Sequence, residues 1–563
     1  MTRILNHIAN SYLLRIFLLL VLGMNTVVVF AQDQKQKEGE VLEGEVIIDK
    51  SLKIELPPAD RIFEKVPPRA ADEGAVRQIE YKMRDFDVPL SDLPVRLRVL
   101  KLKEERLPVY SGNFVKLGIG NYLTPFLDVG LNSKANPSGY YGVHINHISS
   151  IYGPVDKQNS ADSYSKIGFH GKYAGRKASI QGRLNYNRDM VHFYGYPEGT
   201  AVDSDTMRQV FNRVGLNFKI RGLNVDSKFQ YEIDGGAVYV KDKFVSKETG
   251  GKISFLGTSE ITENIGVGLK VDLLHWGYQY GDKESRTLIR VSPFATFSVG
   301  VFEMEAGVNV VYITDTIQYK TNTKLFPKVL IGYHINENVY AYAGLEGDIE
   351  AVSFDLLTGY NPYLKSGVQL VHTSKNLELS VGARGHILQD LSFDIGFKAG
   401  NYKNLYYFIN DSLELNKFDV VYDGGNANVF HPYITLSYLR SNSFGLAASL
   451  HYYKYGTKDI DQPWHRPSFE TSISGWFTIY KKIRISADLF VFTGMKALDY
   501  HTAPETVVTL DPITDLNLKV DYMFSKRYGA FVKLDNVLGR KYSHLLHYPV
   551  RGFQAMIGVS ASF

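Results

Sequence analysis

The chain has 563 residues and a formal charge of +4, because 63 Lys and Arg nearly balance 59 Asp and Glu, and this excludes the basic field that holds a nucleic-acid backbone. Tyr, Phe and Gly are abundant at 38, 32 and 49 residues, a composition that favours strands and tight turns over helices. The absence of cysteine excludes disulfides, thiolate metal sites, cysteine nucleophiles and the lipidated cysteine of a lipoprotein.

Residues 1–31 are predicted to be a signal peptide. Basic Arg3 and Arg15 precede an apolar run over 16–30, and the residues up to Ala31 have the small-residue pattern of a signal-peptidase site. A retained membrane anchor is the alternative, but the run is short and polar residues follow at once. The mature chain is expected to start at Gln32, outside the cytoplasm.

Residues 32–112 are rich in charge and proline and lack the long alternating runs found later. We interpret them as a periplasmic tether, an extended segment in which the proline pairs at 57–58 and 67–68 prevent regular structure. Short apolar patches at 52–56 and 95–102 could dock on another surface. A flexible spacer is an equally good interpretation.

Residues 113–563 show a different pattern, in which apolar and polar residues alternate with a period of two. Such alternation places each class on one face of a strand, and the run over 265–273 is a clear example. Many runs extend over about ten residues, as in a tilted strand that crosses a bilayer, whereas soluble strands have about five or six. The pattern therefore indicates membrane-spanning strands.

The connections between these strands have two lengths, as in outer-membrane barrels with short periplasmic turns and longer outer loops. Short polar turns are predicted at 174–177, 221–224, 336–338, 441–443 and 525–527. Longer segments are predicted around 191–206, 239–249, 350–375, 403–427, 455–465, 495–509 and 541–550. The predicted fold class is all-β, a transmembrane antiparallel β-barrel of about 22 strands in the outer membrane of a Gram-negative cell, with both termini in the periplasm.

Aromatic clusters at 406–408 and 452–453 fall near predicted strand ends, where the interfacial girdles of barrels lie. His144 and His147 lie three apart on one predicted strand and so point to opposite faces. No phosphate loop, zinc-protease helix or nucleophile elbow is present. We therefore predict no catalytic, cofactor-binding or metal site, and no enzymatic activity.

The polar face of the predicted barrel carries charges of both signs. These side chains could guide a solute, or they could simply solvate and cross-link the interior. The candidate lumen-facing residues are Lys219, Lys270, Asp272, Glu303, Glu305, Glu378, Arg384, Arg484, Asp488, Lys519, Asp521, Lys533 and Asp535.

The last predicted strand has an unbroken apolar face that ends in an aromatic residue. Phe553, Ile557, Val559 and Phe563 lie on this face. As a soluble edge such a strand would aggregate, whereas the closing strand of a barrel has a partner. The pattern resembles the signal read by the barrel assembly machinery, which is thus an expected partner during insertion.

A further pattern covers the last forty or so residues. It consists of Val532 to Gly539, Lys541-Tyr542, Tyr548 to Gly552 and the strand to Phe563. It resembles the C-terminal end of TonB-dependent outer-membrane receptors, whose barrels have 22 strands. His547 stands where these receptors usually have Gly, and Arg551 and Gly552 are in reversed order.

The N-terminal part departs from that family. The receptors carry a folded plug domain before the barrel, and the segment 32–112 is too short for a conventional one. Only Val46 to Ile48 could serve as a TonB box, and an incidental apolar patch is the simpler interpretation. A lumen of this width needs a filling. The candidates are the tether, inward-folded loops at 350–375 and 403–427, and a partner protein; we favour loops and tether together.

The resemblance implies a component of solute or nutrient uptake across the outer membrane. A non-transporting scaffold subunit of an outer-membrane complex is the alternative, and a plain diffusion porin is a third interpretation. Expected partners are outer-membrane lipid and either TonB or another envelope protein. No cofactor is expected.

Overall fold

The computed structural model describes residues 112–563 apart from 135, 137, 225–226, 316–319 and 441–442. The predicted signal peptide, the tether up to residue 111 and the Val46 to Ile48 segment lie outside the described residues.

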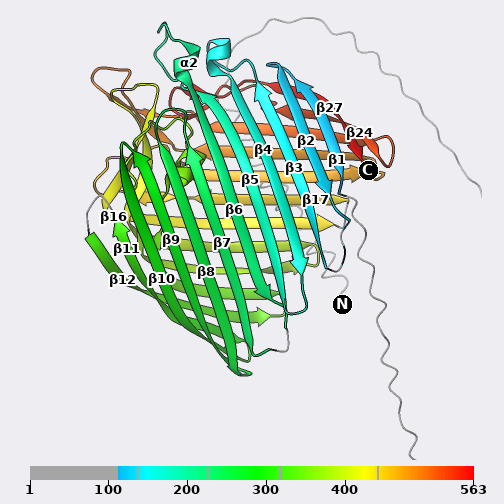
Figure 1. Ribbon diagram of the computed structural model, residues 1–563, viewed down its shortest axis with the longest axis vertical. Helices are drawn as coiled ribbons and strands as arrows, with labels where there is room; N and C mark the ends of the chain where they lie inside the picture. Colours follow the sequence, from blue (N-terminus) through cyan, green and yellow to red (C-terminus); the bar gives the residue numbers. More distant parts are fainter. Residues whose placement is uncertain (1–111, 135, 137, 225–226, 316–319, 441–442) are drawn as a thin grey trace, which may run out of the picture. The chain divides into compact units, whose positions relative to one another are not determined.

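The described chain is almost entirely strand (Figure 1). The first strands are β1 (Phe114–Gly120), β2 (Thr124–Asn132), β3 (Gly139–Ser150), β4 (Asp162–Ala174), β5 (Ala178–His192), β6 (Arg208–Gly222), β7 (Phe229–Lys241), β8 (Lys247–Thr262), β9 (Ile265–Tyr280), β10 (Asp282–Val299), β11 (Phe302–Asp315), β12 (Lys320–Asn336) and β13 (Val339–Glu350). They are followed by β14 (Thr373–Leu388), β15 (Leu391–Asn410), β16 (Phe418–Arg440), β17 (Phe444–Tyr452), β18 (Lys454–Gly456), β19 (Phe469–Ile479), β20 (Ile483–Thr493), β23 (Ile513–Met523), β24 (Tyr528–Asp535) and β27 (Gln554–Ser562). The loops contain the short elements η2 (Lys157–Ser160), α2 (Ser204–Met207), α3 (Phe354–Tyr360), β21 (Lys496–Asp499), β22 (Thr506–Thr509), β25 (Ser543–Leu545) and β26 (Tyr548–Pro549).

The strands form one closed antiparallel sheet. Neighbours in sequence pair with each other around the wall, and β1 pairs with β27 to close it. Strands β17 and β18 both pair with β16 and occupy one position of the wall, so the barrel has 22 strands. The prediction of an all-β, antiparallel barrel of about 22 strands is confirmed.

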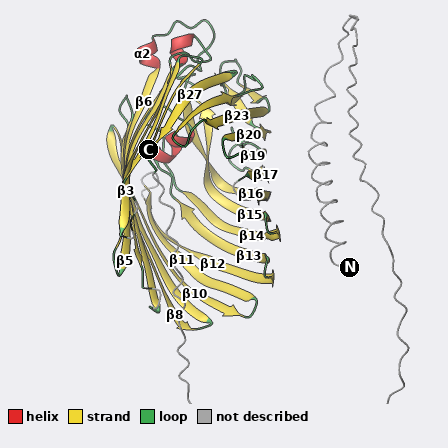
Figure 2. Cartoon of the chain, turned by 90° about the vertical axis from the view of Figure 1, so that its right-hand side faces the viewer, coloured by secondary structure: helices red, strands yellow, loops and turns green. Residues whose placement is uncertain are grey.

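The long connections all lie at one end of the barrel, whereas the connections at the other end are all short (Figure 2). Turns such as 175–177 and 337–338 are short, whereas 193–207, 351–372, 457–468, 494–512 and 536–553 are long. The predicted loop over 403–427 is wrong in extent, because β15 and β16 stay paired up to Asn410 and Phe418. Continuous pairing satisfies the backbone there and leaves a loop of only 411–417.

The alternating pattern divides the wall into an apolar outer face and a polar inner face. On β6, Val214 and Leu216 are exposed on the outside, while Arg213 and Asn217 line an interior cavity. At the closure of the sheet, Ile557 is 62% exposed on the same outer face. Among the described residues, no helix has the length and apolar character needed to cross a membrane.

This division predicts different effects for neighbouring substitutions. Leu216→Lys places a charge on the lipid face, at a cost of about 2–4 kcal/mol near the bilayer centre, and should reduce the assembled fraction. Asn217→Lys points into the cavity at the same depth and should assemble normally. Heat-modifiable gel migration measures both variants. Equal assembly would show that the outer face of β6 does not contact lipid.

Candidate functional site

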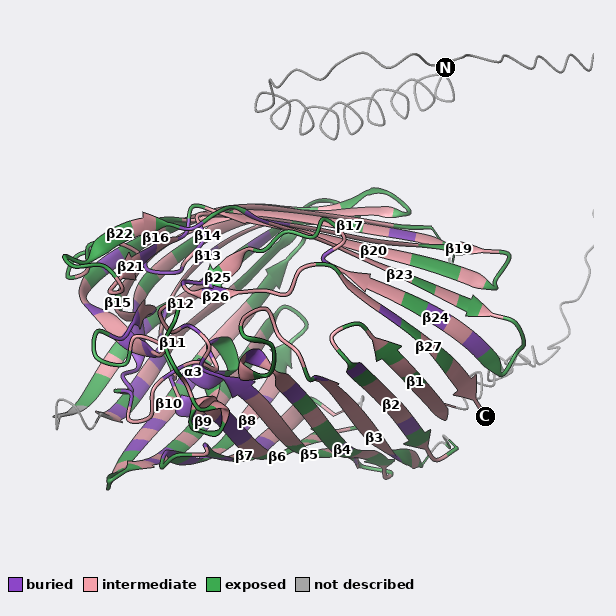
Figure 3. Cartoon of the chain, turned by 90° about the horizontal axis from the view of Figure 1, so that it is seen from above, coloured by how far each residue is buried: buried purple, intermediate pink, exposed green. Residues whose placement is uncertain are grey.

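The most distinctive feature inside the barrel is the loop 351–372, which we call the inner loop. Seen from above, it carries α3 into the opening bounded by the strands (Figure 3). The helix begins at Ser353, whose hydroxyl accepts a hydrogen bond from Leu356 N at 3.1 Å. Asp355 lies in its first turn, where a negative charge is favourable.

A buried acid on the wall binds the start of this helix. The two carboxylate oxygens of Glu248, on β8, accept hydrogen bonds from Phe354 N at 3.0 Å and Asp355 N at 2.9 Å. Arg286, on β10, lies 3.5 Å from Glu248 and donates to Val352 O at 2.9 Å. Both charged side chains are fully buried. The wall therefore supplies the partners that the first N–H groups of a helix lack.

A second charged contact holds the side of the helix. Arg213, on β6, donates to Asp355 at 3.0 Å and to Thr358 at 2.9 Å, and it also pairs with Asp189 on β5. The planar guanidinium reaches three partners at once because its donors form a fixed fork. Two neighbouring strands and α3 are thus joined through one side chain.

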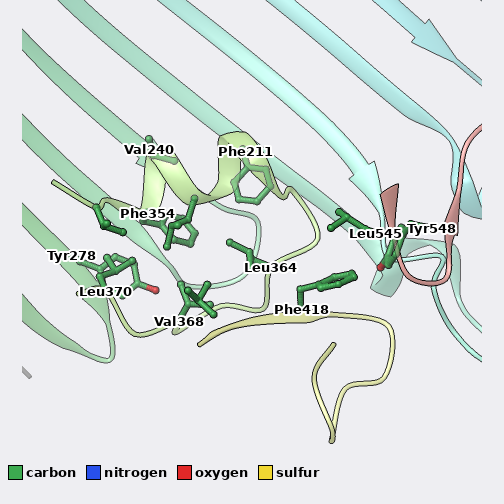
Figure 4. Close-up of a cluster of buried hydrophobic side chains, with 13 residues drawn as sticks. Phe211, Val240, Tyr278, Phe354, Leu364, Val368, Leu370, Phe418, Leu545 and Tyr548 are labelled. Atoms are coloured by element: carbon green, nitrogen blue, oxygen red, sulfur yellow. The ribbon is translucent and has the colours of Figure 1, made fainter. Parts of the chain in front are cut away.

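Apolar side chains of the inner loop then connect opposite walls (Figure 4). The buried cluster consists of Phe211, Val240, Tyr278, Val352, Phe354, Leu357, Leu364, Val368, Leu370, Phe418, Val420, Leu545 and Tyr548. Strands β6 and β16 lie almost opposite each other in a barrel of 22 strands, so this cluster crosses the mouth. Each buried large apolar side chain contributes roughly 1.5–3 kcal/mol.

Two other long loops, 494–512 and 536–553, pack together with the inner loop at the mouth of the barrel. The ring of Tyr548, from 536–553, stacks on Tyr363 of the inner loop at 3.8 Å between centroids. Met495, Ala497 and Leu510, from 494–512, form a second buried cluster with Leu546. The three loops 351–372, 494–512 and 536–553 therefore form one packed unit, which we call the loop seal.

A polar cavity of about 910 Å³ lies beside α3 on the inner face of β5 to β9. Asp355 contributes one side of it, and the wall contributes basic, acidic and amide side chains. The polar lining residues are Gln181, Arg183, Asn185, Asn187, Arg213, Asn217, Lys219, Glu232, Asp234, Lys252, Ser254, Lys270 and Asp355. A site of this size suits a small polar molecule.

The candidate lumen-facing residues are mostly engaged with neighbours. Ion pairs join Lys219 with Glu232 at 2.6 Å, Lys270 with Asp272 at 3.6 Å, Glu305 with Lys328 at 2.6 Å, Glu378 with Lys375 at 3.6 Å, Lys519 with Asp521 at 2.9 Å, and Lys533 with Asp535 at 2.7 Å. Glu303 forms a hydrogen bond with His334 at 3.2 Å. Arg384 lies over the Tyr340 ring and Arg484 over the Trp476 ring, whereas Asp488 faces Ser474 and Asn517 across the sheet. These contacts favour cross-linking of the wall as their role. Lys219 and Lys270 also line the cavity.

The candidate assembly residues lie on or next to β27. Ile557 and Val559 are exposed and pair in register with exposed Ile119 and Leu117 of β1. Phe553 directly precedes the strand and Phe563 follows it, and both are exposed. The terminal apolar face thus belongs to the strand that closes the barrel.

The aromatic cluster at 406–408 is not an interfacial girdle, contrary to prediction. Tyr407 is fully buried, while Tyr406 and Phe408 pack against the cluster of the loop seal. Arg466, from loop 457–468, lies over the Tyr406 ring at 4.9 Å and donates to its carbonyl oxygen. Strands β15 and β16 continue past the predicted strand ends. The rings at 406–408 therefore pack against loops and do not face lipid headgroups.

Sequence reasoning missed Glu248 and Arg286, the residues that position α3. The start of α3 has a local signal, because Ser353 and Asp355 are typical of a helix N-terminus. Glu248 has no local sequence signal, because its contact with Phe354 joins residues that are 106 positions apart in the chain.

One buried histidine makes the loop seal sensitive to pH. Val352 N donates to His372 Nδ1 at 3.1 Å, and burial, with Arg286 nearby, lowers the pKa of His372 to about 3. An accessible histidine has a pKa of about 6.5, so the neutral ring stabilises the seal fully above that pH. This stabilisation is lost as the pH falls from about 6.5 towards 3.

We therefore expect acidification to open the seal more often. Channel openings in planar bilayers should increase between pH 7 and pH 4. His372→Gln keeps an acceptor for Val352 N but does not titrate, so its response to pH should be smaller. His275→Gln, on the wall, serves as the control. An identical response of His372→Gln and the unmodified protein would contradict the assignment.

Comparison with known proteins gives matches among solved structures alone. No family model and no curated protein matches the chain. The FrpB iron transporter from Neisseria meningitidis matches with a TM-score of 0.61 and 9% identity over 80% of this chain and 82% of that chain. The ferric-catecholate import receptor Fiu from E. coli K12 gives 0.60 and 10% over 80% and 81%. The copper transporter OprC gives 0.56 and 12% over 80% of each chain.

At these identities the likeness concerns the fold. The matched proteins are described as transporters or receptors. The C-terminal pattern, the 22 paired strands and the structural matches agree with one another. The chain has the outer-membrane barrel fold of the TonB-dependent receptors.

Proposed function

We propose that this barrel is a component of solute uptake across the outer membrane, in which the loop seal closes the outer mouth and the polar cavity receives the solute. The observation that carries this proposal is the inner loop, which connects opposite walls directly beside the cavity. The long loops then face the outside, and both termini and the short turns face the periplasm. TonB, or another envelope protein, would act from that side.

The chemistry of the cavity indicates the kind of solute. Its lining carries basic, acidic and amide groups side by side, which suits a small polar molecule with hydrogen-bonding groups. Passage requires the inner loop to leave its place, because α3 and its apolar contacts cross the mouth. Uptake therefore depends on motion of 351–372.

Locking the inner loop tests this dependence. Ser366, on the inner loop, donates to Asp242 at 2.6 Å, in the connection 242–246 between β7 and β8. The chain has no native cysteine. Cysteines at both positions can be joined by a bis-methanethiosulfonate and released by a reductant. A strain that lacks the gene should accumulate less of one nutrient in an elemental and metabolite panel. The reduced variant should restore accumulation, the cross-linked variant should not, and each single-cysteine variant treated with the reagent is the control.

A scaffold function is the second candidate, and the tight packing of the loop seal favours it. Glu248, Arg286 and the apolar cluster would serve equally well to keep the mouth permanently closed. A scaffold predicts that the cross-linked variant complements fully. It also predicts that loss of the gene lowers the amount of co-purifying envelope proteins, without an accumulation defect.

A further inference from the structure

Three side chains with metal-binding groups meet in the outer loops. Asp499, His501 and His547 each present a ligand atom, and these atoms lie within 4.8 Å of one another. Asp499 Oδ1 lies 2.9 Å from His547 Nε2, and the two imidazole rings are parallel with centroids 3.7 Å apart. Two separate loops, 494–512 and 536–553, supply these residues.

The local backbone fixes each member. Asp499 ends β21, which pairs with β22, and its Oδ1 also accepts a hydrogen bond from His501 N at 2.9 Å. His501 Nε2 lies 3.3 Å from Leu415 O, so this nitrogen carries the proton and Nδ1 keeps its lone pair. Both hydrogen bonds hold the ligand side chains in position. Ligands of metal ions in proteins commonly have such hydrogen-bond partners.

His547 has an unusual backbone conformation for its residue type. Its φ is 66°, in the left-handed region that favours glycine, and the receptor-like C-terminal pattern usually has glycine there. A non-glycine residue in this region costs of order 1 kcal/mol and is frequent at ligand sites. The backbone conformation at this position therefore favours glycine, and a histidine is present in spite of it.

We propose that Asp499, His501 and His547 bind one divalent first-row transition-metal ion and thereby link the loops 494–512 and 536–553. Two imidazoles and one carboxylate suit zinc, cobalt, nickel, copper or ferrous ions. Ligand atoms of one such ion lie about 3.3 Å apart, because each is about 2.0–2.2 Å from the metal. Asp499 Oδ1 and His547 Nε2 are hydrogen-bonded at 2.9 Å, and the ion would replace the proton between them. The three ligand atoms lie within 4.8 Å of one another, so a small closure of the two loops brings them to the spacing of one ion.

The ion would connect two of the loops that form the loop seal. His547 directly precedes Tyr548, whose ring stacks on Tyr363 of the inner loop, and it follows Leu546 of the second buried cluster. Three ligands leave further coordination positions for water or for a donor atom of an external ligand. This inference does not depend on whether the barrel transports a solute.

Nearby His465 is not a ligand in this arrangement. Its Nδ1 lies 2.9 Å from Phe408 O and its Nε2 accepts from Leu546 N at 3.3 Å, so both ring nitrogens are engaged. On the wall, His431 and His451 contact each other at 3.0 Å and form a separate histidine pair. That pair provides a matched control.

The test uses the full-length protein in detergent, without a histidine tag and after treatment with a chelator. Co²⁺ titration should give one site with the visible absorption of nitrogen and oxygen ligation, and Zn²⁺ should displace the cobalt. Asp499→Asn and His547→Gly should each weaken binding at least tenfold. His451→Gln should bind as the unmodified protein does.

His547→Gly suits the left-handed backbone, and heat-modifiable migration should show that this variant and Asp499→Asn still form the barrel. The proposal is overturned if the unmodified protein binds no cobalt or zinc. It is also overturned if folded Asp499→Asn and His547→Gly retain full affinity, or if His451→Gln loses the site instead.

Discussion

Replacement of residues 353–371 by a short Gly-Ser linker is expected to convert the closed barrel into a wide channel. The replaced segment contains α3 and the apolar side chains that cross the mouth, whereas the wall retains its 22 paired strands. Cells that produce this variant should become sensitive to vancomycin, which is too large for ordinary porins. The purified variant should show large, stable conductance in planar bilayers.

The control replaces 198–202, the tip of another long loop on the same end of the barrel. This tip is largely exposed and contributes nothing to the buried clusters. Both variants should assemble to normal levels by heat-modifiable migration. Normal assembly of the inner-loop variant with unchanged conductance would show that something else closes the lumen, such as the tether or a partner protein.

Glu248→Ala is expected to free the inner loop without opening the wall. The change removes both acceptors of the α3 N–H groups and leaves the charge of Arg286 in a fully buried place. Loss of one partner of a buried ion pair typically costs about 3–5 kcal/mol. The barrel strands do not depend on this contact. The lost free energy therefore destabilises the inner loop in its bound position and leaves the barrel stable.

The expected result is a protein of normal heat-modifiable migration with frequent channel openings and with protease cleavage inside 351–372. Glu260→Ala, an exposed glutamate near the other end of the same strand, is the matched control and should behave as the unmodified protein. If Glu248→Ala shows no more channel openings and no more protease cleavage than Glu260→Ala, Glu248 does not hold the inner loop in place.

The wall of this barrel could be predicted from the sequence because its determinants are local. Each strand alternates between lipid and lumen, so runs such as 265–273 carry the pattern without reference to distant residues. The last strand, which ends at Phe563, and the short polar turns between strands can also be recognised from local sequence alone. The extent of β15 and β16 was less predictable, because aromatic residues at 406–408 suit either an interface or a packed loop.

The site could be predicted only in part. The sequence favoured inward-folded loops as a filling of the lumen, and 351–372 folds inward. It did not indicate Glu248, Arg286 or the cluster of Asp499, His501 and His547, because their partners lie far away in sequence and contact them only after folding. The contribution of the tether to the filling stays a prediction.

The distance between the inner loop and the wall tests the central claim most directly. Spin labels on cysteines at Tyr360, which ends α3 and is exposed, and at Asn217, on the cavity wall, would be the chain's only labels. Pulsed electron paramagnetic resonance on the full-length protein in lipid should give one narrow distribution, centred on the separation in the structure, and Glu248→Ala should broaden it. A broad or longer distribution in the otherwise unmodified protein would contradict a mouth closed by its own inner loop.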